Sequence, residues 1–238
     1  MFPILRKEFN SFFASPIAYL VIGTFLMANG LFLWVFKGDF NILNAGFADL
    51  NSFFYLAPWV FLFLIPAITM KSFADEFGSG TIEGLRTKPL TDWQIVLGKF
   101  LASLLLIVLA LLPTLTYVYT VYALANPTGK IDLGGTIASY IGLLFLAATY
   151  TAIGLFTSTF SKSQIVAFIA SACITFFFFY GFDAMAGLFD NSYAIQQLGI
   201  YEHFKSVSRG VIDSRDLVYF ISITFFFLFI TKIQLTNE

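Results

Sequence analysis

Uncharged apolar segments dominate the pattern of this 238-residue chain. Six stretches of at least fifteen residues contain no charged side chain: Phe9–Phe36, Leu50–Met70, Phe100–Gly129, Leu133–Ser161, Ser163–Phe182 and Leu217–Thr231. A helix needs about 20 apolar residues to cross the hydrocarbon core of a bilayer. Five stretches reach this length, and the sixth reaches it if Lys232 extends to the interface. The pattern predicts an all-α integral membrane protein with six transmembrane helices, forming one domain over residues 1–238.

Proline and capping residues indicate where these helices begin and bend. We expect spans at about 17–36, 53–70, 96–122, 136–158, 164–182 and 217–233. Ser15 is expected to cap the first span, with Pro16 at its first helical position. Thr91 and Gln94 have the spacing of a capping box before the third span. Pro113 predicts a kink inside that span.

The N-terminal residues 2–14 have a helical period of their own. One face of this helix would carry Phe2, Leu5, Phe9, Phe12 and Phe13. We expect an amphipathic helix that lies in the membrane interface and contacts lipid. The alternative is that it extends the first span into water. The first apolar stretch is too long for the core of a signal peptide, so we expect it to remain in the mature protein.

Composition excludes several classes of protein. Only 11% of the residues are charged and 58% are hydrophobic, whereas soluble domains average about 25% charged residues. The net charge of −1 gives no basic surface, so nucleic acid is not an expected partner. Cys173 and His203 are the only residues of their types, which excludes multi-cysteine and multi-histidine metal sites. We expect no cofactor.

Lysine and arginine positions predict the orientation. With the N-terminus inside, eight fall on the cytoplasmic side: Arg6, Lys7, Lys71, Arg86, Lys88, Lys99, Lys162 and Lys232. Five fall outside, three of them in one long segment: Lys37, Lys130, Lys205, Arg209 and Arg215. Both termini are therefore expected in the cytoplasm.

The six uncharged stretches contain no Asp, Glu, His, Lys or Arg, which transporters coupled to ions usually carry within the membrane, and Lys99 and Lys232 fall only at the cytoplasmic ends of their expected spans. The chain also has no Gly-x-x-x-x-Gly-Lys-Ser/Thr phosphate-binding loop, so nucleotide chemistry would have to come from another subunit. Small residues four apart, such as Gly154 with Ser158, permit close contacts between helices.

Two polar segments remain as candidates for function. The segment 71–90, on the cytoplasmic side, mixes charges of both signs with apolar residues. It is either a contact surface for a partner or a solvated loop. The segment 183–216, outside, has Phe204 and Val207 on one helical face, and Asp213 with Asp216 could cap the last span. We interpret His203 as a surface or interface residue and not as a ligand.

Specific motifs resemble the permeases of ABC-2 type transporters. They are Gly80-Thr81-Ile82-Glu83, then Pro89, then Ile95-Val96-Leu97-Gly98-Lys99 leading into a span. More narrowly, residues 6–16, 202–204 and 209–217 resemble the gliding-motility subfamily, the Gld F-type permease subunit. One departure is Gly84-Leu85, where family members often have Leu-Leu.

The resemblance implies an ABC-2, type V exporter-like fold in the bacterial inner membrane. It also implies a permease half that pairs with a second permease subunit, identical or different, and is driven by a separate ABC ATPase subunit. The implied ATPase-coupling loop comprises Phe73, Asp75, Glu76, Phe77, Gly80, Thr81, Ile82, Glu83 and Arg86, of which Phe73, Phe77 and Ile82 would be apolar anchors. Ser161, Lys162 and Ser163 would form a smaller second contact. An external gate would contain Glu202, His203, Phe204, Arg209 and Asp213.

Two alternatives to an ATP-driven permease remain. One is a secondary transporter coupled to an ion gradient, against which the uncharged spans argue. The other is a membrane scaffold of a motility or secretion machine that transports nothing. The external segment could likewise be a lid of purely structural use instead of a gate.

Overall fold

A computed structural model of the protein describes residues 1–86, 90–188, 192–210 and 213–237. This part of the chain is helical and contains no strand, which confirms the predicted all-α class. Six helices are long and apolar enough to cross a membrane: Ile17–Val35, Asn51–Ser79, Asp92–Leu124, Leu133–Ser158, Gln164–Ala186 and Ser214–Thr236. The predicted number of transmembrane helices is thereby confirmed.

The first half of the chain contains α1 (Phe2–Ala14), α2 (Ile17–Gly30), the π-helical turn η1 (Leu31–Val35), the short η2 (Ile42–Asn44), α3 (Asn51–Thr69), α4 (Lys71–Ser79), α5 (Thr81–Arg86), α6 (Asp92–Leu111), η3 (Leu112–Thr114) and α7 (Leu115–Leu124). The second half contains α8 (Leu133–Ser158), α9 (Gln164–Phe176), η4 (Phe177–Gly181), α10 (Phe182–Ala186), α11 (Ser192–Gln196), α12 (Ile200–Val207) and α13 (Ser214–Asn237).

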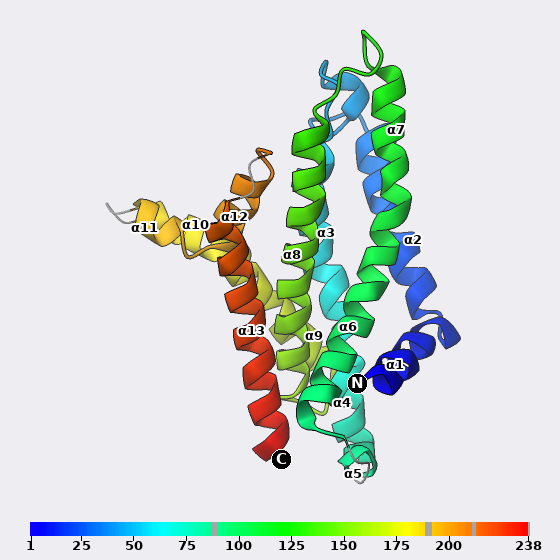
Figure 1. Ribbon diagram of the computed structural model, residues 1–238, viewed down its shortest axis with the longest axis vertical. Helices are drawn as coiled ribbons and strands as arrows, with labels where there is room; N and C mark the ends of the chain where they lie inside the picture. Colours follow the sequence, from blue (N-terminus) through cyan, green and yellow to red (C-terminus); the bar gives the residue numbers. More distant parts are fainter. Residues whose placement is uncertain (87–89, 189–191, 211–212, 238) are drawn as a thin grey trace.

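The long helices run side by side as a bundle, and shorter helices mark its two ends (Figure 1). At one end α4 continues the direction of α3 beyond the bundle, and the C-terminus lies at the same end. The amphipathic helix α1 lies across the long axis beside α6, and its position at a membrane surface stays a prediction. The helices α10, α11 and α12 project sideways above the beginning of α13. We call the end that carries α4 and α5 the α4 end.

The centre of the bundle is α8, which packs against α3, α6, α9 and α13. Most of its side chains are buried, including the whole of Tyr150. A close contact with α3 depends on Gly154, because a Cβ atom there would lie 2.9 Å from Thr69 Cβ. By contrast, α2, α9 and α13 leave large apolar side chains exposed, such as Met27 and Ile165. These faces are suited to lipid or to another membrane subunit.

Local sequence signals at the helix ends are partly confirmed. Thr91 and Gln94 form the predicted capping box at the start of α6, each side chain bonding the other residue's backbone N–H. Pro113 interrupts the third span, which passes through a 3₁₀ turn between α6 and α7. The predicted cap at Ser15 is wrong, because its hydroxyl donates back to the Phe12 carbonyl at 3.2 Å. Ser15 therefore serves the end of α1, whereas α2 begins without a side-chain cap.

The capping box at Thr91 allows a first test of these boundaries. Thr91→Ala is expected to lower the free energy of unfolding by about 1 kcal/mol, because the backbone N–H of Gln94 loses its acceptor. Thr91→Ser keeps the hydroxyl and should leave stability nearly unchanged. Unfolding in mixed detergent micelles measures both, and equal losses for the two variants would contradict the capping role.

Candidate functional site

At the α4 end, three helices meet around one buried lysine. Lys99 on α6 is 2% exposed. Its ammonium lies 2.9 Å from Glu76 Oε1 on α4 and 3.2 Å from Glu8 Oε1 on α1. It also donates a hydrogen bond of 2.6 Å to the carbonyl of Ser72. One side chain thus links α1, α4 and α6, and we call these four residues the Lys99 cluster.

The charged side chains in the Lys99 cluster and the neighbouring Lys7 differ in their exposure to solvent. Lys7 lies 3.6 Å from Glu8 and 3.8 Å from Glu76, but its side chain is 59% exposed. Glu76 Oε2 is buried and accepts no hydrogen bond. Because water screens the exposed lysine, Lys99 is the principal counter-charge of both carboxylates.

Two adjacent residues of α6 allow α1 to come this close. A Cβ atom at Gly98 would lie 2.8 Å from Ile4 Cγ2, so a larger residue would push α1 away. The next residue, Lys99, then reaches the carboxylate of α1. Its ammonium also lies 5.1 Å from the centre of the Phe73 ring, at a distance suited to a cation–π interaction.

The α4–α5 segment extends beyond the bundle at this end (Figure 1). Gly80 separates the two helices with a φ of 70°, a left-handed conformation that glycine adopts without steric cost. Asp75, Gly80 and Thr81 are exposed. The predicted contact loop is therefore mostly helical, and part of it faces outward.

The second predicted contact, at Ser161, Lys162 and Ser163, lies against α4. The side-chain amide of Gln164 donates to the carboxylate of Asp75. A Cβ atom at Gly78 would lie 3.2 Å from the Lys162 carbonyl oxygen. The structure therefore brings the two predicted segments together on one surface, although they are far apart in the sequence.

Some predicted contact residues face inward instead. Phe73 is fully buried and Ile82 is 8% exposed, both in the protein's own core beside α6 and α8. Phe77 is partly buried against the same core. The apolar faces of Phe73 and Ile82 are thus largely covered within this chain, part of Phe77 stays accessible, and an anchoring role for the three stays a prediction. The side chains of Glu83 and Arg86 lie outside the described part of the structure.

At the beginning of α13, a second polar cluster surrounds the single histidine. His203 Nδ1 lies 2.6 Å from Asp216 Oδ1, and Nε2 lies 2.9 Å from the Gln197 carbonyl oxygen. The ring stacks on Tyr219 with centroids 3.7 Å apart. Tyr219 in turn donates a 2.6 Å hydrogen bond to the Leu198 carbonyl. These contacts fasten the segment 197–203 to the first turns of α13.

The caps predicted for α13 are half confirmed. Asp213 Oδ1 accepts from the backbone N–H of Arg215 at 2.9 Å, as expected of a capping residue. The predicted cap at Asp216 is wrong, since that carboxylate faces His203 instead.

The other predicted gate residues divide between core and surface. Phe204 is 4% exposed and packs near Gly142 of α8. Glu202 pairs with Lys205 at 3.5 Å, one helical turn away, and Arg209 is exposed. Their role as a gate stays a prediction.

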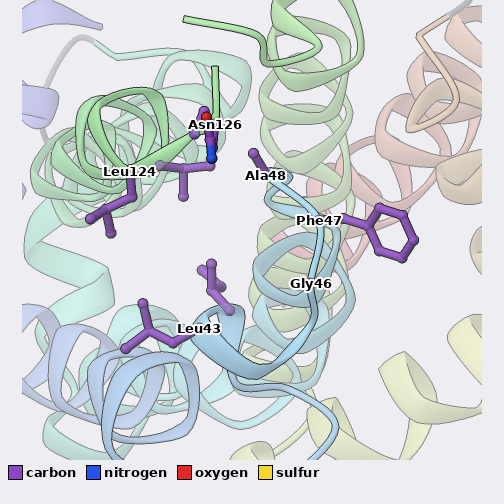
Figure 2. Close-up of a pocket in the computed structure, with 9 residues that line it drawn as sticks. Leu43, Gly46, Phe47, Ala48, Leu124 and Asn126 are labelled. Carbon is purple, nitrogen blue, oxygen red and sulfur yellow. The ribbon is translucent and has the colours of Figure 1, made fainter. Parts of the chain in front are cut away.

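A hollow of about 270 Å³ lies between the loop after η2 and the end of α7. Figure 2 shows Leu43, Leu124 and Asn126 around this space, while the ring of Phe47 points away from it. No lining residue is ionisable, so the hollow offers no acid–base chemistry. Among the described residues, no group of three or more His, Cys, Asp and Glu side chains could hold a metal ion.

Sequence reasoning missed the importance of Glu8, Lys99 and Asp216. From the sequence, Lys99 is expected only to be a cytoplasmic positive charge and part of a motif. A signal was available, because Lys99 lies two turns inside an otherwise apolar helix and such a lysine needs a partner. The sequence did not indicate which carboxylates would supply it.

The chain matches the family model described as ABC-2 family transporter protein over residues 4–209. It belongs to this family. The protein is therefore a multi-pass transmembrane permease component of the ABC-2 class, a class that works with an ABC ATPase partner. No curated protein matches the sequence.

Proposed function

We propose that this protein is the permease subunit of an ABC transporter in the bacterial inner membrane, with both termini in the cytoplasm. In this proposal a separate ATPase subunit docks on α4, α5 and the loop 161–163. The Lys99 cluster is the observation that carries the proposal. It connects the projecting α4 to α1 and to the span that begins at α6, so a push on α4 reaches the membrane part.

The mechanism follows from the parts that share the cluster. When the ATPase closes on nucleotide, it displaces α4 and α5, and the Lys99 cluster moves α1 and α6 with them. The spans then rearrange between inward-facing and outward-facing states by sliding of packed helices. Asp75, Gly80 and Thr81 contact the ATPase, whereas Glu76 transmits the movement within the permease.

A second permease subunit, of the same or a different sequence, completes the transporter in this proposal. The exposed apolar faces of α2, α9 and α13 support it, since both a partner and membrane lipid could cover them. The sequence similarity of residues 6–16, 202–204 and 209–217 to the gliding-motility subfamily supports a link with motility. The segment from α10 to α12 would then act as the gate on the outer side.

A charge reversal tests the docking surface. Glu83→Arg on α5 is expected to reduce the ATPase activity that copurifies with the tagged protein from native membranes by at least about tenfold, because like charges at an interface cost several kcal/mol. The matched control is Asp39→Arg, which also replaces one negative charge by a positive one, at an exposed residue outside the α4 end. The control should leave the copurified activity unchanged.

Three results would contradict this proposal. Equal losses for Glu83→Arg and Asp39→Arg would show that the α4 end is not the docking surface. Solute uptake driven by an ion gradient in vesicles that lack any ATPase would identify a secondary transporter instead. If a bound ATPase hydrolyses ATP but no solute of any substrate class tried is transported, the membrane scaffold would be favoured.

A further inference from the structure

The two ring nitrogens of His203 both face groups that can only accept hydrogen bonds. Nδ1 faces a carboxylate oxygen of Asp216 and Nε2 faces the backbone carbonyl of Gln197. A neutral imidazole carries one N–H and can donate to only one of them, whereas the protonated ring donates to both. The arrangement therefore requires one proton more than a neutral histidine and an ionised aspartate supply together.

The burial of Asp216 makes this extra proton more important. Asp216 is 5% exposed, and its second oxygen, Oδ2, is buried without any hydrogen-bond partner. An ionised carboxylate in such a place is unfavourable unless a positive charge lies beside it. When His203 loses its proton, Asp216 keeps its burial and loses that counter-charge.

We propose that His203 and Asp216 form a proton-binding site that fastens helix α12 to the beginning of the last span. With the proton bound, His203 donates to both acceptors and holds the segment 197–203 on α13. When a rise in pH removes this proton, one ring nitrogen becomes an acceptor that faces another acceptor. The buried carboxylate then favours separation, and α12 moves away from α13.

The other charged groups near His203 do not replace this proton. On α12, Glu202 is occupied by Lys205, and on α13, Asp213 caps the helix while Tyr219 stacks on the ring. A cavity of about 570 Å³ lies beside His203 and Asp216, and protons can exchange with the solution through it. It is also lined by Arg209, Arg215 and Tyr193. Behind it, Gln196 donates to Asp183 on α10.

The neighbouring tyrosine Tyr201 is also unsuited to this role. Burial raises the pKa of its phenol above the ordinary value, and the nearby groups Tyr55, Asp183, Glu202 and Tyr180 raise it further. Tyr201 therefore stays neutral across the range in which a histidine titrates. This leaves the His203–Asp216 pair to respond to the external medium.

This proposal does not depend on an ATPase or on transport, because it concerns only the position of α12. It is tested in lipid nanodiscs with two spin labels, at Ser206→Cys on α12 and Ile137→Cys on α8, in a Cys173→Ala background. Neither Ser206 nor Ile137 is a hydrogen-bond partner of His203 or Asp216, Ser206 lines the cavity beside them, and Ile137 is exposed. We expect a narrow distance distribution at about pH 6 and loss of its narrow component at about pH 8.5.

Three variants distinguish a proton site from a structural contact. His203→Gln and Asp216→Asn cannot form the charged pair, so each should give the same distribution at both pH values. Tyr219→Phe removes the hydrogen bond to the Leu198 carbonyl, which involves no titration in this range. It should broaden the distribution at both pH values and keep the difference between them.

Two results would overturn the proposal. The first is an unchanged wild-type distribution between the two pH values. The second is a pH response that persists in His203→Gln, which would assign it to another group. Because His203 is the only histidine of the chain, a tag without histidine keeps the experiment free of other imidazoles.

Discussion

Replacing Lys99 with methionine is expected to lower the free energy of unfolding by about 3–5 kcal/mol, because two largely buried carboxylates lose their shared counter-charge. Glu8 and Glu76 would remain 16% and 13% exposed, with the solvated Lys7 as their remaining ion-pair partner in the described part of the chain. Methionine has a similar length, so the loss comes from the charge and not from a cavity. Unfolding in mixed detergent micelles, followed by circular dichroism, measures the effect.

The control for this experiment lies in the same place. Lys7→Met also removes one positive charge that lies beside Glu8 and Glu76. Because the Lys7 side chain is 59% exposed, its ion pairs should contribute about 1 kcal/mol or less. A triple variant with Lys99→Met, Glu8→Gln and Glu76→Gln should recover part of the stability. Equal losses for Lys99→Met and Lys7→Met would show that burial does not set the strength of this cluster.

The second large effect is expected at Gly154, where Gly154→Ala should destabilise the protein by about 1–3 kcal/mol through overpacking. The added methyl group would lie 2.9 Å from Thr69 Cβ and 3.2 Å from Thr69 Cγ2 on α3. Thr69 cannot easily turn away, because it is fully buried and its hydroxyl donates to the Ile65 carbonyl at 2.9 Å. The two central helices must therefore separate.

Gly23→Ala is the matched substitution. Gly23 lies on the exposed side of α2, and a Cβ atom there would have no neighbour within 4 Å. Without a clash, the change should be neutral or stabilise the helix by up to about 1 kcal/mol. The same unfolding measurement compares the two variants. A loss at Gly23 as large as the loss at Gly154 would indicate that helix contact is not the reason.

The α4–α5 segment shows how far the sequence could predict the candidate site. Its mixture of charged and apolar residues predicted a short amphipathic segment beside the membrane. The sequence could not determine what each side chain contacts, because an apolar residue such as Phe73 suits the surface of a partner as well as the core of its own chain. Phe73 faces the core beside α6, and Asp75 faces Gln164 on α9.

The His203 cluster shows the same limit at the other polar segment. The sequence identified Asp213 and Asp216 as residues near the start of a helix, where carboxylates are common. Only the path of α12 over the beginning of α13 decides that Asp213 caps the helix and that Asp216 binds the histidine. This pairing depends on the direction of α12, whose His203 lies thirteen residues before Asp216. No local sequence pattern gives that direction.

The sequence by itself determined the number of spans, the helical class and the family, because long uncharged segments can satisfy their backbone groups in lipid only as helices. Tertiary structure alone decided which charges meet. The absence of a side chain at Gly98 brings Glu8 on α1 to Lys99, and the path of α4 brings Glu76 to the same ammonium. The physical reason is that a buried charge is tolerated only beside its partner, and helices far apart in the chain supply that partner.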